Sequence, residues 1–266
     1  MRASFIGAIA LLAAACQTVQ TTQPGAIGVD RKQVMMVSAE KVDQGAKVAY
    51  DQEVSKARSA GMLNADREEY QRVQKISQRL IPQTNTFRPD AAGWNWEVNV
   101  QTSEDVNAYC MPGGKIMVYT GLIDVVKPTD AELAAVIGHE IAHALREHSR
   151  ERLSRAYAEQ MVLAGVAIAT GAQQTTMELA SQISAVTFTL PHSREQEAEA
   201  DRIGLELMAR AGYDPNAAVT LWQKMSKGGS GGPPEFMSTH PSGESRIRDL
   251  EKNIPRVLPL YQAAKK

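Results

Sequence analysis

Apolar residues follow a helical spacing in the first third of the chain. The stretches 31–60 and 64–81 carry apolar residues three and four positions apart, which predicts two helices that each bury one face. Pro82 comes directly after the second stretch and is expected to end that helix, because proline lacks the backbone N–H that a helix interior requires. We therefore predict that the folded body begins with two helices.

The pattern changes to alternation between Trp94 and Val100, which predicts a strand. Two more strands are predicted over Val106–Met111 and Lys115–Thr120. The residues Pro112-Gly113-Gly114 lie between these two and predict a tight hairpin turn. The sheet is therefore expected to be small and antiparallel.

Two later helices have recognisable beginnings. Thr129 and Glu132 form a capping box directly before an apolar run, and Ser193 and Gln196 form a second capping box. A last helix is expected over roughly 243–262. Since helical stretches outnumber strands, we expect a mostly helical α+β fold around a small antiparallel sheet.

Composition excludes several classes of protein. Hydrophobic residues make up 43% and charged residues 22% of the 266 positions, which excludes a disordered chain and a multi-span membrane protein. Aromatic residues are only 5%, so the core must be mainly aliphatic, and Cys110 is expected to be a small buried member of it. The formal net charge of −1 gives no electrostatic case for a nucleic-acid partner.

The N-terminus has the pattern of a bacterial export signal that ends in a lipid-acceptor cysteine. Residues 1–15 are predicted to be a signal peptide and Cys16 the lipidation site. Residues 16–29 are expected to be a polar tether, followed by one folded domain over 30–266 that keeps its activity when cut free. Gln17 rather than Asp follows the cysteine, and the resemblance to sorted bacterial lipoproteins implies anchoring on the periplasmic side of the outer membrane. A secreted protein and an uncleaved anchor are the alternatives.

The motif His139-Glu140-x-x-His143 lies in the helix that Thr129 is predicted to begin. Positions four apart on a helix differ by only about 40°, so both imidazoles face the same side and can bind one Zn²⁺. Glu140 lies beside them, where a carboxylate can take the proton of the attacking water. The motif therefore predicts a hydrolytic zinc site.

Two histidines do not complete such a site, because a catalytic zinc has three protein ligands. His148 lies about 180° from His139 on an extended helical wheel, on the side of Leu133 and Ile137, and we reject it as a ligand. His192 directly precedes a predicted helix cap and is not on a helical face, which makes it a poor candidate.

The acidic run after Ser193 is the better source of a third ligand. Its helical geometry gives two pairs of carboxylates one turn apart, Glu195 with Glu199 and Glu197 with Asp201. In the second pair, Asp201 could accept the far N–H of a ligating histidine and fix its tautomer. Geometry alone leaves both pairs open.

Together these residues resemble metallopeptidase family 48, in its exported bacterial lipoprotein branch. The resemblance covers about residues 30–255. It rests on the following segments: His139-Glu140-x-x-His143, Ser193-Arg194-x-x-Glu197-x-Glu199-Ala200-Asp201, Asn107 to Lys115, Tyr119-Thr120-Gly121-Leu122, Thr239-His240-Pro241-Ser242 and Arg246-Ile247.

The resemblance implies a zincin of the gluzincin type with one Zn²⁺ per chain. It assigns His139, His143 and Glu197 as ligands and Glu140 as the catalytic group. It also selects the Glu197/Asp201 pair, with Asp201 behind a ligand. In zincins an edge strand above the metal binds the substrate as an added strand, a role that Asn107 and Ala108 would have here. The implied partners are unfolded or extended polypeptides.

His240 follows the Gly/Pro-rich stretch 227–234 and has three possible roles. It could donate a hydrogen bond to the oxyanion, it could occupy the open zinc position and hold the resting enzyme shut, or it could simply pair with the last helix. The glycine-rich stretch slightly favours the second role.

The expected function is a zinc metalloendopeptidase that cleaves misfolded or mislocalised cell-envelope proteins. One alternative is a zinc-containing chaperone or assembly factor for outer-membrane proteins that rarely cleaves. A second alternative is a zinc hydrolase that acts on the peptides of peptidoglycan.

Overall fold

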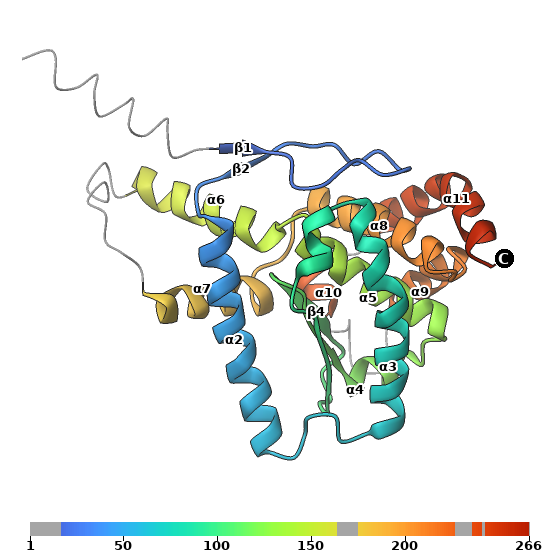
Figure 1. Ribbon diagram of the computed structural model, residues 1–266, viewed down its shortest axis with the longest axis horizontal. Helices are drawn as coiled ribbons and strands as arrows, with labels where there is room; N and C mark the ends of the chain where they lie inside the picture. Colours follow the sequence, from blue (N-terminus) through green and yellow to red (C-terminus); the bar gives the residue numbers. More distant parts are fainter. Residues whose placement is uncertain (1–16, 164–174, 227–235, 241–242, 266) are drawn as a thin grey trace, which may run out of the picture.

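A computed structural model describes residues 17–163, 175–226, 236–240 and 243–265 (Figure 1). Residues 1–16, and with them the predicted signal peptide and Cys16, lie outside these ranges. The elements in chain order are β1 (Gln17–Val19), β2 (Gln33–Met35), α2 (Ala39–Ser59), α3 (Arg67–Leu80), η1 (Ile81–Thr86), η2 (Pro89–Gly93), β3 (Glu97–Gln101), β4 (Ala108–Met111), β5 (Lys115–Tyr119), α4 (Thr120–Val126), α5 (Asp130–Leu145), α6 (His148–Leu163), α7 (Thr176–Phe188), α8 (Arg194–Arg210), α9 (Asn216–Ser226), α10 (Phe236–Thr239) and α11 (Glu244–Ala264).

The fold is mostly helical α+β, as predicted. Helix α5 is its centre, and α3, α6, α8, α9 and strand β4 all pack against it. Every residue from Glu132 to Leu145 is buried, so this helix has no solvent-facing side. Both predicted capping boxes are confirmed, at Thr129 before α5 and at Ser193 before α8. They fix where the two helices that carry the motif residues begin.

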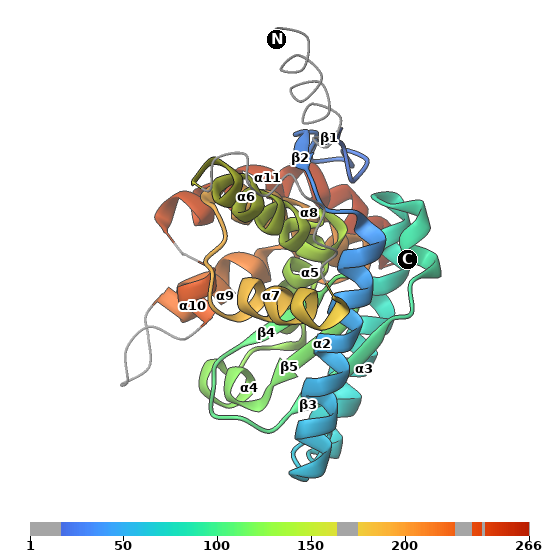
Figure 2. The same cartoon turned by 90° about the vertical axis from the view of Figure 1, so that its left-hand side faces the viewer.

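The sheet differs from the prediction in one respect. The predicted hairpin is confirmed, since β4 and β5 are antiparallel. Strand β3, however, pairs parallel with β5, and the order is β3-β5-β4. The chain crosses from β3 past the central strand to the far edge before it turns back, so the sheet is mixed. This topology leaves β4 as an edge strand that packs on α5 (Figure 2).

The expectation of a free tether before residue 30 is wrong. Strand β1 pairs with β2 at one end of the molecule, beside α6 (Figures 1 and 2). Ile27 and Val29 are buried, and the backbone N–H groups of Ala26 and Ile27 donate to Oε2 of Glu206 in α8 at 2.7 and 3.1 Å. The segment packs on the domain because it supplies apolar side chains and satisfies a buried carboxylate.

Helices α5 and α8 cross with almost no space between their backbones. A Cβ on Gly204 would lie 2.8 Å from the backbone nitrogen of His139 and 3.0 Å from the carbonyl carbon of Gly138. Only two glycines allow such an approach. The close crossing brings the side chains of α8 directly onto the motif residues of α5.

The structure also bears on Cys110 and on membrane-spanning helices. Cys110 is a free, buried cysteine in β4, as expected. No helix in the described part of the chain is both long and apolar enough to cross a membrane.

Candidate metal centre

Helix α5 places the two motif histidines side by side. Nε2 of His139 and Nε2 of His143 are 3.0 Å apart, and both residues, like Glu140, are no more than 5% exposed. Successive turns of one helix give this approach, as the motif spacing requires. Two imidazole nitrogens therefore meet in a buried space next to α8.

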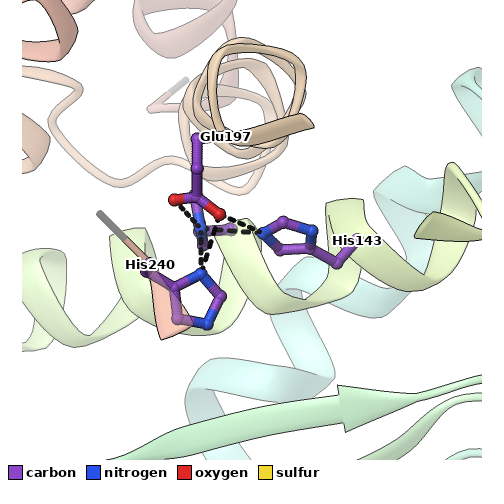
Figure 3. A group of neighbouring side chains, drawn as sticks. His143, Glu197 and His240 are labelled. Carbon is purple, nitrogen blue, oxygen red and sulfur yellow. Dashed lines mark hydrogen bonds and ion pairs between the residues drawn. The ribbon is translucent and has the colours of Figure 1, made fainter. Parts of the chain in front are cut away.

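Helix α8 adds a carboxylate to this pair. Oε1 of Glu197 lies 3.4 Å from Nε2 of His143, and Oε2 lies 3.5 Å from Nε2 of His139. Figure 3 shows Glu197 reaching from α8 toward the ring nitrogens of His143 and His240. The side chain of Glu197 is fully buried. A fully buried carboxylate at this place requires positive charge around it.

His240 adds a fourth ligand atom. Its Nδ1 lies 3.0 Å from Oε1 of Glu197 and 3.3 Å from Nε2 of His139. The ring stacks on Phe236, whose backbone N–H donates to the carbonyl of Val106 at 3.0 Å. This backbone bond ties the short helix α10 to the start of β4 and holds His240 over the motif.

These four atoms fit a zinc ion. Ligand bonds of 2.0–2.1 Å in a tetrahedron put neighbouring ligand atoms about 3.3 Å apart. Five of the six residue pairs in the cluster have such a distance, between 3.0 and 3.5 Å, when Oε2 of Glu197 is used for the pair with His139 and Oε1 for its pairs with His143 and His240. The donor set of three imidazoles and one carboxylate is also the set that zinc prefers.

The charges of the cluster agree with a cation site. Burial would lower the pKa of His139, but the carboxylates of Asp201 and Glu197 outweigh it and raise that pKa to about 9. Burial lowers the pKa of His143 well below its usual value, so this ring stays neutral and keeps a free electron pair. The two carboxylates therefore attract positive charge to this place.

Asp201 lies where the Glu197/Asp201 pairing places it. Its Oδ1 is 3.0 Å from Nδ1 of His139, on the side of the ring away from the cluster. Arg246 in α11 holds this carboxylate with two bonds of 2.6 Å, and its third nitrogen lies 2.5 Å from Oε2 of Glu197. The guanidinium also lies over the ring of Trp222 at 3.8 Å. Arg246 thus fixes both acidic side chains relative to α5.

The placement of His148 corrects the helical-wheel argument. Helix α5 ends at Leu145, and Glu147 has a positive φ of 50°, so His148 begins a new helix rather than continuing the wheel toward the core. Nδ1 of His148 lies 2.8 Å from Nδ1 of His143, and its Nε2 lies 3.0 Å from Oε2 of Glu199. His148 therefore supports the far side of His143, as Asp201 does for His139.

The chain is similar in sequence to a known peptidase family and to several of its members. The model of peptidase family M48 matches residues 67–254. The chain belongs to peptidase family M48. It is 34% identical over 213 residues to the mitochondrial metalloendopeptidase OMA1 of Bos taurus, a match that covers 76% of this chain and 40% of that protein. It is 43% identical over 161 residues to the OMA1 of Arabidopsis thaliana, which covers 59% of this chain and 31% of that protein.

A bacterial relative matches as well. The beta-barrel assembly-enhancing protease of Escherichia coli is 27% identical over 203 residues, which cover 71% of this chain and 40% of that protein. The chain thus spans less than half the length of each of these relatives. The family is one of metallopeptidases, and the cluster of His139, His143, Glu197 and His240 is compatible with a bound metal ion.

Sequence reasoning missed two contributors to this M48 site. Arg246 belongs to one of the segments that carry the family resemblance. A basic residue in such a segment could have suggested an ion pair with the acidic residues of the site. For His148 the helical wheel predicted a position facing the core, away from the site. That prediction was wrong because the wheel was extended past the end of α5. Among the other predicted residues, the structure brings Asn107 and Ala108 to the cleft beside Glu140 and His143. The Glu195 side chain remains 59% exposed.

Proposed function

We propose that the chain is a zinc metalloendopeptidase in which His139, His143 and Glu197 hold the metal. The observation that carries this proposal is the buried Glu140 carboxylate, which lines the same cleft as His143, His240 and Ala108 of edge strand β4. A base, a metal site and a substrate-binding edge therefore share one cleft. A zinc-containing assembly factor would not need the first of these.

Glu140 has the environment of a general base. Burial raises its pKa, while His240 and His139 partly oppose that rise. A raised pKa makes the ionised carboxylate a stronger base toward the attacking water, and acid–base catalysis is most efficient when the pKa of the group lies near the working pH. Zinc bound at the cluster would supply Lewis-acid polarisation and the activation of water.

Other residues of the chain keep the ligands in place. Asp201 and His148 face the far nitrogens of His139 and His143, which orients both rings toward the cluster. His240 places its Nε2 3.5 Å from Oε1 of Glu140 and its Nδ1 against Glu197. In this arrangement His240 stands at the position that an attacking water needs, which supports the role of a removable fourth ligand.

Strand β4 is the proposed binding edge for an extended substrate. In the described sheet it pairs with β5 alone. The N–H of Ala108 donates to Oδ1 of its own neighbour Asn107 at 2.8 Å. A substrate carbonyl would replace this side-chain acceptor, and main-chain pairing of this kind tolerates many side chains. The proposed substrates are therefore unfolded or extended polypeptides.

We further propose that these substrates are misfolded or mislocalised envelope proteins and that lipid on Cys16 anchors the enzyme to the periplasmic side of the outer membrane. The support is the signal-like pattern of residues 1–16. Cys16→Ser is expected to move the protein from the membrane pellet to the soluble or unprocessed fraction, because acyl chains supply the anchor. If the processed Cys16→Ser protein still appeared in the membrane pellet, this result would contradict the lipid anchor.

The test of the enzymatic proposal is cleavage of unfolded casein by the purified, zinc-loaded protein. Glu140→Gln is expected to keep its zinc and to lose cleavage by at least about 10²-fold, because the general base is gone. Glu195→Gln, which removes an exposed carboxylate of the same type, is the matched control and should cleave normally. Equal cleavage by Glu140→Gln and the wild type would overturn the proposal.

A further inference from the structure

The cleft beside the metal cluster has a second wall that the proposed mechanism does not use. Glu140 and His143, together with Ala108 of β4 and the preceding Asn107, form one wall of this narrow cleft. The second wall comes from α6, the end of α7 and the segment before α8, and its polar members are Ser149, Arg152, Thr187 and His192. The two walls meet where the ring of His192 packs on that of His143, with centroids 3.9 Å apart. A peptide bound along β4 would lie between these walls.

Arg152 is the charged group of that second wall. The residue is only 8% exposed, and one of its terminal nitrogens donates to the carbonyl of Leu190 at 2.6 Å. Its Nε has no acceptor, and within the described ranges no carboxylate comes within ion-pair distance of it. Other buried arginines of the molecule differ in this respect, since Arg146 and Arg246 both contact carboxylates directly.

Two neighbouring groups also lack a partner. Nδ1 of His192 and Oγ1 of Thr187 are buried without a hydrogen bond, and both residues line the same cleft as Arg152. The backbone N–H of His192 donates to the carbonyl of Thr239 at 2.9 Å, so the ring is held in place. The Tyr109 hydroxyl and Oε1 of Glu140 are also unpaired in this cleft. Buried polar atoms are nearly always paired, and the three unpaired groups on the Arg152 side indicate a missing polar ligand there.

The chemistry of the orphans indicates an anion. Glu197, Glu140 and Glu151 act on Arg152 electrostatically, but none of them forms an ion pair with it. A buried guanidinium without a carboxylate in direct contact costs free energy, and a bound carboxylate offsets that cost with charge-assisted hydrogen bonds. Burial lowers the pKa of Arg152 to about 10, which leaves the group positive at neutral pH. A hydrogen bond to the Leu190 carbonyl needs only one neutral donor. This bond alone therefore does not account for a charged guanidinium with several donors at this position.

We propose that Arg152, with His192 and Thr187, forms a subsite that binds a carboxylate of the substrate next to the scissile bond. This inference rests on the proposed peptidase function and adds a specificity to it. The carboxylate comes either from an Asp or Glu side chain near the cleavage position or from the free C-terminus of a short product-side segment. Both sources present the same planar acceptor to the guanidinium.

The experiment compares matched peptides with the full-length, zinc-loaded protein. One series carries Glu or Gln at each of the three positions on either side of the scissile bond, and another pair has a free or an amidated C-terminus. We expect the wild type to cleave the charged member of one pair about tenfold faster in kcat/KM, mainly through KM, because a charge-assisted bond is worth roughly that factor. The pair that shows the preference identifies the source.

Variants then connect the preference to Arg152. Arg152→Gln is expected to bring the charged-to-neutral ratio close to one with zinc content unchanged, and Arg152→Lys to keep part of the preference. Arg155→Gln is the matched control, because this arginine lies on the same helix, is about half exposed and pairs with Glu151. It should leave the ratio as in the wild type.

The outcomes are distinguishable. A wild type that cleaves none of the peptides and no casein contradicts the peptidase proposal itself. If the wild type cleaves the charged and the neutral member of every pair at the same rate, the carboxylate subsite is overturned. This result does not depend on whether any variant folds. An Arg152→Gln protein that loses activity on both members equally also overturns it, because that pattern indicates only structural support of the Leu190 segment.

Discussion

Glu195, Glu197 and Glu199 follow one another at intervals of two positions, yet each has a different environment. The Glu195 side chain is 59% exposed, whereas that of Glu197 is fully buried against the histidine cluster. Glu199 is buried on another side of α8, where it contacts His148 and Arg146. Their different burial leads to different expectations for the same substitution.

The first prediction concerns metal content. Glu197→Gln is expected to lose most bound zinc and its peptidase activity, because a buried ligand charge is removed, while Glu195→Gln should keep a full complement. Glu199→Gln should lie between them, with zinc affinity about 10-fold to 100-fold lower, since it weakens the support of His143 through His148. Metal analysis and chelator competition on the purified variants measure this. Full zinc in Glu197→Gln would contradict the ligand assignment.

The second prediction concerns His240. Its Nδ1 stands within 3.3 Å of both His139 and Glu197, at the fourth corner of the cluster. If His240 is a removable ligand, His240→Ala frees that corner for water, and peptide turnover should equal or exceed that of the wild type. Turnover with zinc content confirmed is the measurement. A fall of about 10²-fold or more would instead indicate an oxyanion donor.

Sequence reasoning reached the ligand-bearing positions more readily than their supports. The motif spacing places His139, Glu140 and His143 because a helix has a fixed period. The role of His148 could not be read in this way, since it depends on where α5 ends, and Glu147 ends it with a left-handed backbone conformation that a non-glycine residue rarely adopts. The orphaned Arg152 is likewise invisible without its surroundings.

At the scale of elements, the site depends on how closely α5 and α8 approach. The third prediction is that Gly204→Ala lowers the free energy of unfolding by about 1–3 kcal/mol and weakens zinc binding, because its Cβ would press on the backbone of His139. Gly93→Ala is the matched control, since nothing lies within 4 Å of a Cβ at that position. Thermal unfolding with and without zinc measures both effects. Equal stability of the two variants would show that the helices can separate without cost.

The elements also show what a pattern of alternation can predict. Alternating residues indicated β3, and the turn residues between β4 and β5 indicated their antiparallel pairing, both of which the structure contains. Alternation carries no information on the direction in which two strands pair when a long connection joins them. The parallel pairing of β3 with β5 therefore could not be predicted.

At the scale of the whole molecule, the N-terminal segment is connected to the metal cluster. Arg31 contacts Glu199 and Glu151, Arg146 contacts Glu199 and donates to Thr21, and Glu199 leads through His148 to His143. A polar tether would make no such contacts. The segment thus belongs to the folded unit and supports the site at a distance.

The fourth prediction follows from these contacts. A fragment that begins at residue 30 was expected to keep its activity; we now expect a Tm about 5–10 °C below that of a fragment beginning at residue 17, and weaker zinc binding. The loss of Ile27 uncovers apolar surface, and the loss of the Ala26 N–H leaves the buried Glu206 carboxylate with fewer donors. Calorimetry of both fragments, with zinc titration, measures this. Identical thermal transitions of the two fragments would contradict this prediction and support the original interpretation of the segment as a tether.

The fifth prediction concerns acid stability. Burial would raise the pKa of Glu199, but His148 and Arg31 outweigh it and lower that pKa from 4.5 to about 2; the same kind of contacts with Arg31 lower the pKa of Glu151. A carboxylate with a lowered pKa stabilises the fold fully above its ordinary pKa and loses this effect as the pH falls toward the lowered value. The difference in Tm between wild type and Arg31→Gln should therefore be constant above pH 4.5 and shrink toward pH 2. A difference that does not depend on pH would contradict the ion pair.

The long reach of the N-terminal segment has a consequence for the order in which the molecule folds. Ala26 and Ile27 find their acceptor in Glu206, some 180 residues further along the chain. The centre itself needs side chains from His139 to Arg246, so a nascent chain cannot assemble it until almost all of its residues are available. Contacts of such high sequence separation form late, because loop closure has to precede them. The proposed peptidase would therefore have a complete metal site only after most of its chain has been synthesised.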